Sequence, residues 1–140
     1  MAHVQHLPLY SSIYRFIREL YRIKLKLPKI IKHDLGQEVF QSSLKLIKCV
    51  VLANNAQEKG LHISRLLLES EVQWVLIRLL FDLRGISEGE FKVLSEQLRE
   101  IEKQAQAWLK WQQNSQAKKP ASQKEYKNTW QPSEKEITWP

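Results

Sequence analysis

Residues 91–108 read FKVLSEQLREIEKQAQAW, and their apolar side chains recur at alternating steps of three and four residues. The positions that carry this repeat are Phe91, Leu94, Leu98, Ile101, Ala105 and Trp108. On an α-helix, such steps align the side chains in one narrow seam. The stretch therefore predicts an amphipathic helix that buries this seam against neighbouring helices.

The rest of the chain has the composition of further helices. It is rich in leucine, isoleucine, lysine, glutamate and glutamine, and no proline interrupts residues 29–119. Pro28 suits the first turn of a helix, whereas Gly60 and Gly85 favour helix ends. Ser87, followed three residues later by Glu90, forms a capping box that begins another helix. Helices are therefore expected near residues 8–26, 29–58, 61–84 and 87–112.

Helices joined by such short connections predict an all-α fold. Sequential neighbours are then antiparallel, which gives an up-down four-helix bundle over residues 1–112. Residues 113–140 are polar, contain two internal prolines and show no helical period, so we expect a flexible tail. Trp130 and Trp139 in this tail would either anchor a partner or fold back onto the same subunit, and the sequence leaves both readings open.

The third expected helix is apolar around most of its circumference. Nine of the twelve residues from 72 to 83 are apolar, which is too many for one buried stripe. A small bundle does not easily cover such a helix alone, so we expect a subunit interface in a homo-oligomer. The candidate interface residues are Trp74, Ile77, Leu80 and Phe81. The alternative is a helix that simply occupies the centre of the bundle.

The net charge of +7 is concentrated near the first helix. Residues 15–32 hold seven lysines or arginines and one acidic residue, Glu19, for a net charge of +6. On a helical wheel, four of these cations fall within an arc of about 80°, opposite the apolar side chains. They are Arg15, Arg18, Arg22 and Lys26. Lys29 and Lys32 extend the region across the proline, and the six residues are named the cationic strip.

The cationic strip matches phosphates spaced along a nucleic acid, which arginine binds in a bidentate manner. Two alternatives are an anionic membrane surface and a merely solvated helix face. The membrane is less favoured because the bundle needs the apolar face of this helix. The solvated face is less favoured because such faces mix charge signs, and this one hardly does.

The sequence carries no catalytic or metal-binding motif. Cys49 lies in an apolar run and is interpreted as a small core residue rather than a nucleophile. No two histidines stand at metal-binding spacing within one helix, and no phosphate-binding glycine loop or nucleophile elbow occurs. The sequence therefore predicts a protein that is not an enzyme, with no cofactor and no metal. Its apolar runs are only a few residues long and its first twelve residues do not read as a secretory signal, so we also expect no membrane association and a cytoplasmic location.

One segment is more specific than these patterns. Residues 27–37 read LPKIIKHDLGQ, which resembles the helix-junction signature of the accessory variability determinant family of diversity-generating retroelements. The resemblance continues at residues 9–14, 76–84 and 107–110, and it covers residues 9–111. Leu27 replaces the aromatic residue of the signature, and Lys32 stands near its basic position.

This resemblance implies a four-helix bundle that assembles as a homopentameric barrel, encoded by a bacterium or a phage. It also implies a non-catalytic partner of a reverse transcriptase that binds template RNA and cDNA and supports mutagenic retrohoming. By matching to the motif, Pro28 marks the helix junction, and Leu35 with Gly36 marks close packing against a neighbour.

A second resemblance ranks lower. Proteins encoded in ribosomal-RNA intervening sequences share the bundle and a proline at this junction. Their motif later in the second helix is not matched at residues 51–57, which read VLANNAQ. This alternative implies a structural oligomer with a generic polyanion-binding basic face.

Overall fold

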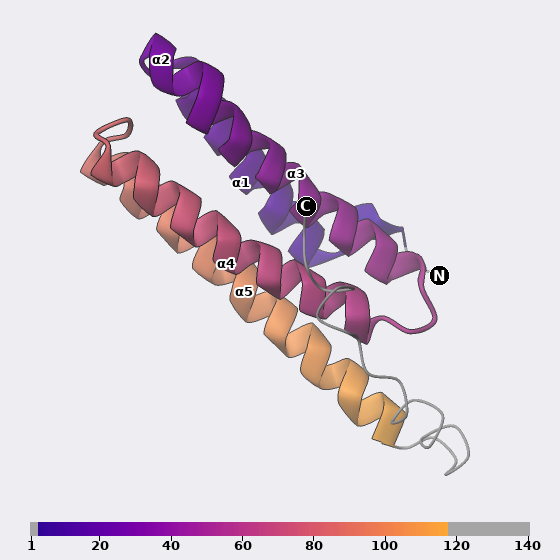
Figure 1. The fold of residues 1–140 in the computed structure, drawn as a ribbon. Helices are drawn as coiled ribbons and strands as arrows, with labels where there is room; N and C mark the ends of the chain where they lie inside the picture. Colours follow the sequence, from indigo (N-terminus) through magenta and orange to yellow (C-terminus); the bar gives the residue numbers. More distant parts are fainter. Residues whose placement is uncertain (1–2, 118–140) are drawn as a thin grey trace.

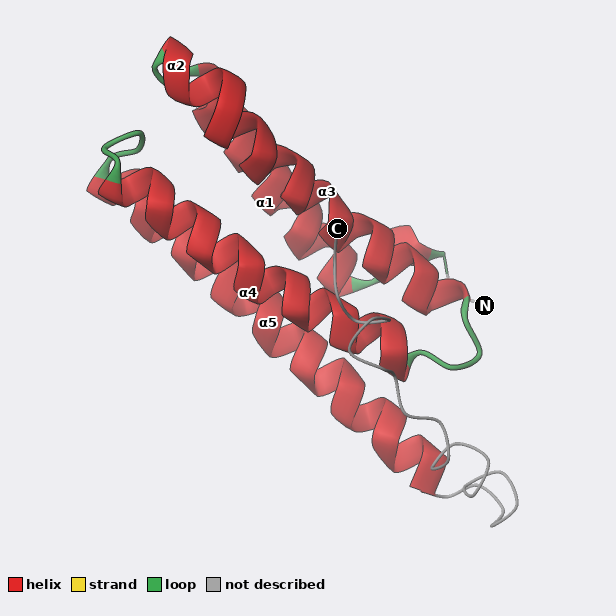
Figure 2. Cartoon of the chain, viewed as in Figure 1, coloured by secondary structure: helices red, strands yellow, loops and turns green. Residues whose placement is uncertain are grey.

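The computed structural model describes residues 3–117 of the 140-residue chain. Its elements are a 3-10 turn η1 (Val4–His6), α1 (Pro8–Leu25), α2 (Lys29–Ile31), a π-helical turn η2 (Lys32–Gly36), α3 (Gln37–Asn55), α4 (Gly60–Asp82) and α5 (Glu88–Ala117). The described residues form helices and connecting loops without any strand (Figure 2). The all-α prediction is confirmed.

The long helices pack in a ring around one core. α1 contacts α3 and α5, and α4 contacts the same two helices from the other side. Figure 1 shows α1 beside α3 and α4 beside α5, with α2 at one end of the bundle. Short loops join successive helices, so the described chain forms an up-down four-helix bundle.

The seam of α5 lies in this core. Leu94, Leu98, Ile101 and Ala105 are fully buried, while Phe91 and Trp108 close its two ends as half-buried residues. The other helices supply Phe16, Leu46, Leu66 and further leucines and isoleucines to the same cluster. The predicted heptad pattern therefore identified the buried face of α5 correctly.

The second expected helix, near residues 29–58, is continuous along the chain, but its hydrogen-bonding pattern changes part-way. α2, η2 and α3 follow one another without a loop, but residues 32–36 adopt π-helical geometry. Gly36 lies inside this turn and is buried. A Cβ atom there would stand 2.7 Å from Leu27 Cδ1 and 3.1 Å from the carbonyl oxygen of Ile31. Glycine at this position lets the end of α1 pack directly on the turn.

α3 ends earlier than expected and by a different device. It stops at Asn55, and Gly60 begins α4 instead of closing the preceding helix, so that expectation is wrong. The Lys59 ammonium group donates hydrogen bonds to the carbonyl oxygens of Ala53, Asn54 and Ala56 at 3.0, 3.0 and 2.8 Å. A lysine therefore satisfies the unpaired carbonyls at the end of α3 and complements its dipole.

The end of α4 places an arginine where glycine is usual. Arg84 has a φ of 62°, in the left-handed region, while Gly85 follows with an ordinary negative φ. The Gly85 amide donates to the Leu80 carbonyl at 2.8 Å, and the Arg84 amide donates to the Phe81 carbonyl at 3.0 Å. This is the Schellman pattern of helix termination, with its left-handed position one residue before the expected glycine.

α5 begins as predicted and ends later. The Ser87 amide donates to Glu90 Oε1 at 2.9 Å, and the Glu90 amide donates to Ser87 Oγ at 3.0 Å, so the capping box is confirmed. The helix continues to Ala117, five residues beyond the expected end. Its last turns pack on the rest of the bundle, because Gln112 is buried and Gln116 Nε2 donates a hydrogen bond to Glu58 Oε2 at 2.9 Å. Trp130 and Trp139 lie outside the described residues.

We predict that Arg84→Gly raises the free energy of unfolding by about 0.5–1 kcal/mol, because glycine adopts the left-handed region without a Cβ clash. Urea denaturation followed by circular dichroism measures the change. Arg84→Ala is the matched control, since it removes the same charge but keeps the Cβ atom. Equal effects of the two substitutions would contradict the backbone explanation.

Candidate nucleic-acid interface

The two faces of α1 have opposite characters. Ile13, Phe16, Leu20 and Ile23 are buried in the core. Arg15, Arg18, Arg22 and Lys26 are exposed on the outside of the same helix. The helical-wheel argument thus places these cations as predicted, because the apolar face must turn inward and carries the strip outward with it.

The cations of the strip differ in their surroundings. Arg22 Nη1 lies 3.2 Å from Glu19 Oε2, but its side chain is 60% exposed, so this pair contributes little stability and leaves the guanidinium accessible. The Arg18 guanidinium lies 6.0 Å from the centroid of the Tyr14 ring. Lys26 and Lys29 are exposed beside the turn between α1 and α2.

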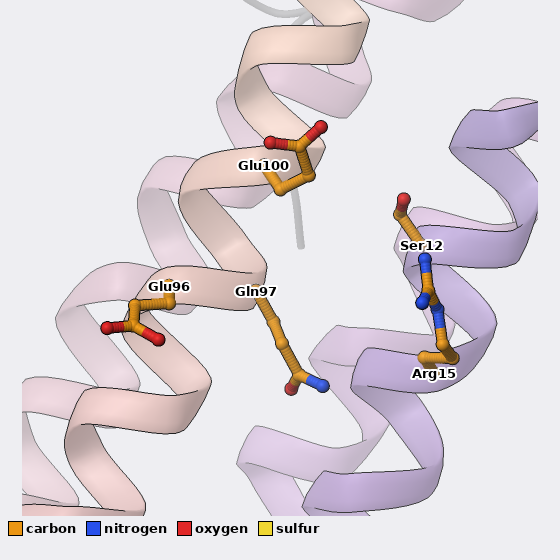
Figure 3. Close-up of a pocket in the computed structure, with 5 residues that line it drawn as sticks. All are labelled: Ser12, Arg15, Glu96, Gln97 and Glu100. Atoms are coloured by element: carbon orange, nitrogen blue, oxygen red, sulfur yellow. The ribbon is translucent and has the colours of Figure 1, made fainter.

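Arg15 is the least favourable phosphate ligand of the strip. It lines a groove of about 250 Å³ between α1 and α5. Figure 3 shows Arg15 and Ser12 on α1 opposite Glu96, Gln97 and Glu100 on α5. The two carboxylates on the facing helix offset the positive charge of Arg15 and repel phosphate groups.

Lys32 serves the fold as well as the charge. Its ammonium group donates a hydrogen bond of 3.2 Å to the carbonyl oxygen of Leu25, at the end of α1. The residue is half-buried, unlike Lys29 on the preceding turn. Lys32 thus caps α1 from the π-helical turn, and its role in nucleic-acid binding stays a prediction.

The junction motif has a clear structural role. Pro28 stands immediately before α2 with extended backbone angles, so it separates α1 from the next helix. Leu35 is half-buried in the π-helical turn, next to the buried Gly36. The motif therefore shapes the sharp reversal that brings Lys29 and Lys32 beside the end of α1.

Two of the four candidate interface residues on α4 are placed incorrectly by sequence reasoning. Ile77 and Leu80 are 0% and 1% exposed in the core of their own subunit, so they have no surface left for a second one. Trp74 and Phe81 are half-buried against α5, where Arg99 lies 6.0 Å from the Trp74 ring and Phe81 stacks on Phe91 at 4.7 Å. A helix that is apolar on all sides does not reveal from sequence which side faces the core.

The outer face of α4 carries a different apolar set. Val72, Val75, Leu79 and Leu83 are 38%, 67%, 41% and 55% exposed. Their spacing of three or four residues places them on one line along the helix, and this set is named the α4 ridge. The α4 ridge was not predicted from the sequence. It lies on the same helix as the predicted interface residues but on its solvent-facing side.

The comparison with known families follows the same span as the fold. The family model described as bAvd-like matches residues 8–112, which run from the first residue of α1 to near the end of α5. The chain belongs to the bAvd-like family. The predicted relation to accessory variability determinants is confirmed. No curated protein and no solved structure matches the chain.

The bAvd-like family suggests an accessory protein rather than a catalyst. This fits the prediction that the chain is not an enzyme. Within residues 3–117, no three histidine, cysteine or acidic side chains gather as metal ligands would. Across the same residues, none of the helices combines the length and the apolar character that crossing a membrane requires.

The bAvd-like bundle also buries ionisable groups between α3 and α4. Burial, together with the nearby Glu69 carboxylate, raises the pKa of the Cys49 thiol to about 11, although Arg65 and Lys45 act in the opposite direction. The thiol is thus protonated at neutral pH, in agreement with its interpretation as a core residue. Glu69 is 1% exposed, and burial raises the pKa of this carboxyl while Lys45 lowers it.

This burial gives a pH-dependent prediction. The folded state favours protonated Glu69, so its stabilising contribution is lost as pH rises above the unfolded pKa of about 4.5. Replacing Glu69 with glutamine removes this loss. We expect the stability of Glu69→Gln relative to the native protein to increase from pH 4 towards pH 7. Thermal unfolding across this range checks the trend, and a stability difference that stays constant from pH 4 to pH 7 would contradict the prediction.

Proposed function

We propose that this bAvd-like protein is a non-catalytic accessory factor that holds nucleic acid for the reverse transcriptase of a diversity-generating retroelement. Template RNA and the growing cDNA are its ligands, and mutagenic retrohoming is the process it supports. The observation that carries the proposal is the cationic strip on the outer face of α1 in a chain of this family.

The electrostatics of α1 support phosphate binding. Arg18, Arg22, Lys26 and Lys29 are exposed along one side of the bundle, and Glu19 is the one acidic residue within residues 15–32. Cations held at such spacing displace the counterions of a phosphate backbone, and this displacement drives binding without regard to base sequence. The strip therefore supplies affinity and orientation, and the polymerase supplies the chemistry.

The α4 ridge supports self-association, and we propose a homopentamer because the family resemblance implies one. Its exposed valines and leucines form a line of apolar surface, and the exposed ion pair between Arg78 and Asp82 lies beside this line. Water contact with such a line is unfavourable, and a second copy of the helix bundle would cover it. A pentamer would repeat the cationic strip five times, and the repeated strips would hold one nucleic acid with increased avidity.

The first test removes charge from the strip. The triple variant Arg18→Gln, Arg22→Gln and Lys26→Gln should lose at least tenfold in affinity for single-stranded RNA at low salt. Its log–log salt slope should also fall by roughly two, because three phosphate contacts are lost. Fluorescence anisotropy at several salt concentrations measures both quantities, and circular dichroism confirms the helical fold.

The matched control removes the same charge from α5, with the exposed lysines changed as Lys92→Gln, Lys103→Gln and Lys110→Gln. If both triple variants bind RNA alike, net charge alone explains the binding, and the strip is not the site.

The second test concerns assembly. Val75→Glu with Leu79→Glu should convert the oligomer into a single chain of 16.6 kDa, because carboxylates cannot be buried unpaired in an apolar contact. Light scattering after size exclusion measures the mass. Val93→Glu, at an exposed valine on α5, should leave the oligomer intact. A native protein that is already a single chain would contradict the proposed pentamer.

A further inference from the structure

We propose that Tyr14 and Tyr21 are stacking platforms for unpaired bases, so that the α1 surface selects single-stranded nucleic acid over duplex. This inference rests on the proposed function, since it adds a base-contacting part to the cationic strip.

Both rings are open to solvent beside the strip. Tyr14 and Tyr21 are 49% and 47% exposed, although they belong to a helix whose apolar side chains are otherwise mostly covered. They are seven residues apart, which is two helical turns and about 10 Å along the axis. Two rings at this separation can each accept a base from one extended strand.

Each exposed ring lies against a second ring. Tyr14 stacks on the half-buried Tyr10 with centroids 6.0 Å apart and planes inclined by 23°. Tyr21 lies against the half-buried Phe40 of α3, with centroids 5.3 Å apart. Rings held in place before binding lose little conformational freedom when a base stacks on them.

Cations lie within reach of both rings. The Arg18 guanidinium is 6.0 Å from the Tyr14 centroid, and Lys24 Nζ is 6.0 Å from the Tyr21 centroid. Arg18 also stands between the two tyrosines along the helix. A strand whose bases stack on the tyrosines would therefore place its phosphates beside positive charge.

The charge around the rings favours a nucleic acid over a protein occupant. Beside the apolar α4 ridge lies the Arg78–Asp82 ion pair, whose opposite charges offset each other, as expected near a contact between subunits. The tyrosines instead alternate with Arg18, Arg22 and Lys24 on α1. Aromatic side chains interleaved with cations match the alternation of bases and phosphates in a single strand.

Duplexes lack the feature that the tyrosines would bind. Paired bases are already stacked on one another inside the helix, so a duplex offers its phosphates to the strip but no open base face to the rings. The strip alone would bind both forms. The tyrosines add affinity for the unpaired form only, which suits a factor that holds a template strand for copying.

The test compares strand forms with the full-length protein. The probes are a labelled 20-nucleotide oligouridylate and a labelled RNA duplex of equal length. The double variant Tyr14→Leu with Tyr21→Leu should lose about tenfold or more in affinity for the single strand, and duplex affinity should change less than threefold. The conservative double variant Tyr14→Phe with Tyr21→Phe keeps both rings and should bind as the native protein does.

Each result has a distinct meaning. If the native protein binds neither probe, the proposed function fails. If it binds both probes, and the leucine variant retains native affinity for the single strand, the cationic strip stands and the stacking inference is overturned. If the leucine variant loses affinity for both probes and also changes in oligomeric mass, the rings belong to a protein contact, which likewise overturns the inference. The single variant Tyr14→Leu, which leaves the Tyr21–Phe40 contact in place, separates lost stacking from local misfolding.

Discussion

The shared apolar core uses one face of every long helix, and the faces left outside determine what the molecule can contact. Phe16, Leu46, Leu66 and Leu98 come from four different helices and meet in one buried cluster. Because each helix is long, its outer face is long as well, so any chemical pattern there runs along the bundle as a line. The arginines and lysines of α1 and the valines and leucines of α4 are two such lines. Burial of the core fixes the orientation of both at once.

This constraint explains which parts of the structure the sequence predicted. α1 and α5 are amphipathic, so the positions of their apolar residues indicated both the buried face and its charged opposite. α4 is apolar all round, and its sequence did not distinguish Ile77 in the core from Val75 at the surface. The sequence also did not predict the π-helical turn, which depends on contacts with residues outside the turn. It did not predict the left-handed Arg84 either, because the glycine that suggested the end of the helix stands one position later. Local rules identified helix starts better than helix ends.

The count of charges in the sequence suggested that all six cations of the strip have the same surroundings. Six cations lie close together in sequence, yet the fold gives them different neighbours. Lys32 turns back to cap α1, and Arg15 lines a groove that Glu96 and Glu100 of α5 also line. Arg18, Arg22 and Lys26 remain on the side of α1 that faces solvent. A sequence reports the charge of a helix face but not the charge of the helix packed beside it, so the effective strip is shorter than the formal one.

The two lines of surface place opposite demands on one small bundle, and their separation resolves the conflict. Apolar contact between subunits requires the removal of water and the absence of unpaired charge, whereas phosphate binding requires exposed cations. α1 and α4 lie on opposite sides of the ring of helices, since each packs on α3 and α5. Assembly through α4 would therefore leave α1 uncovered in every subunit. If the cations and the apolar residues shared one helix face, covering that face in a subunit contact would also cover the cations that bind phosphate. Their placement on opposite helices would let the proposed self-association and the proposed strand binding take place in the same chain.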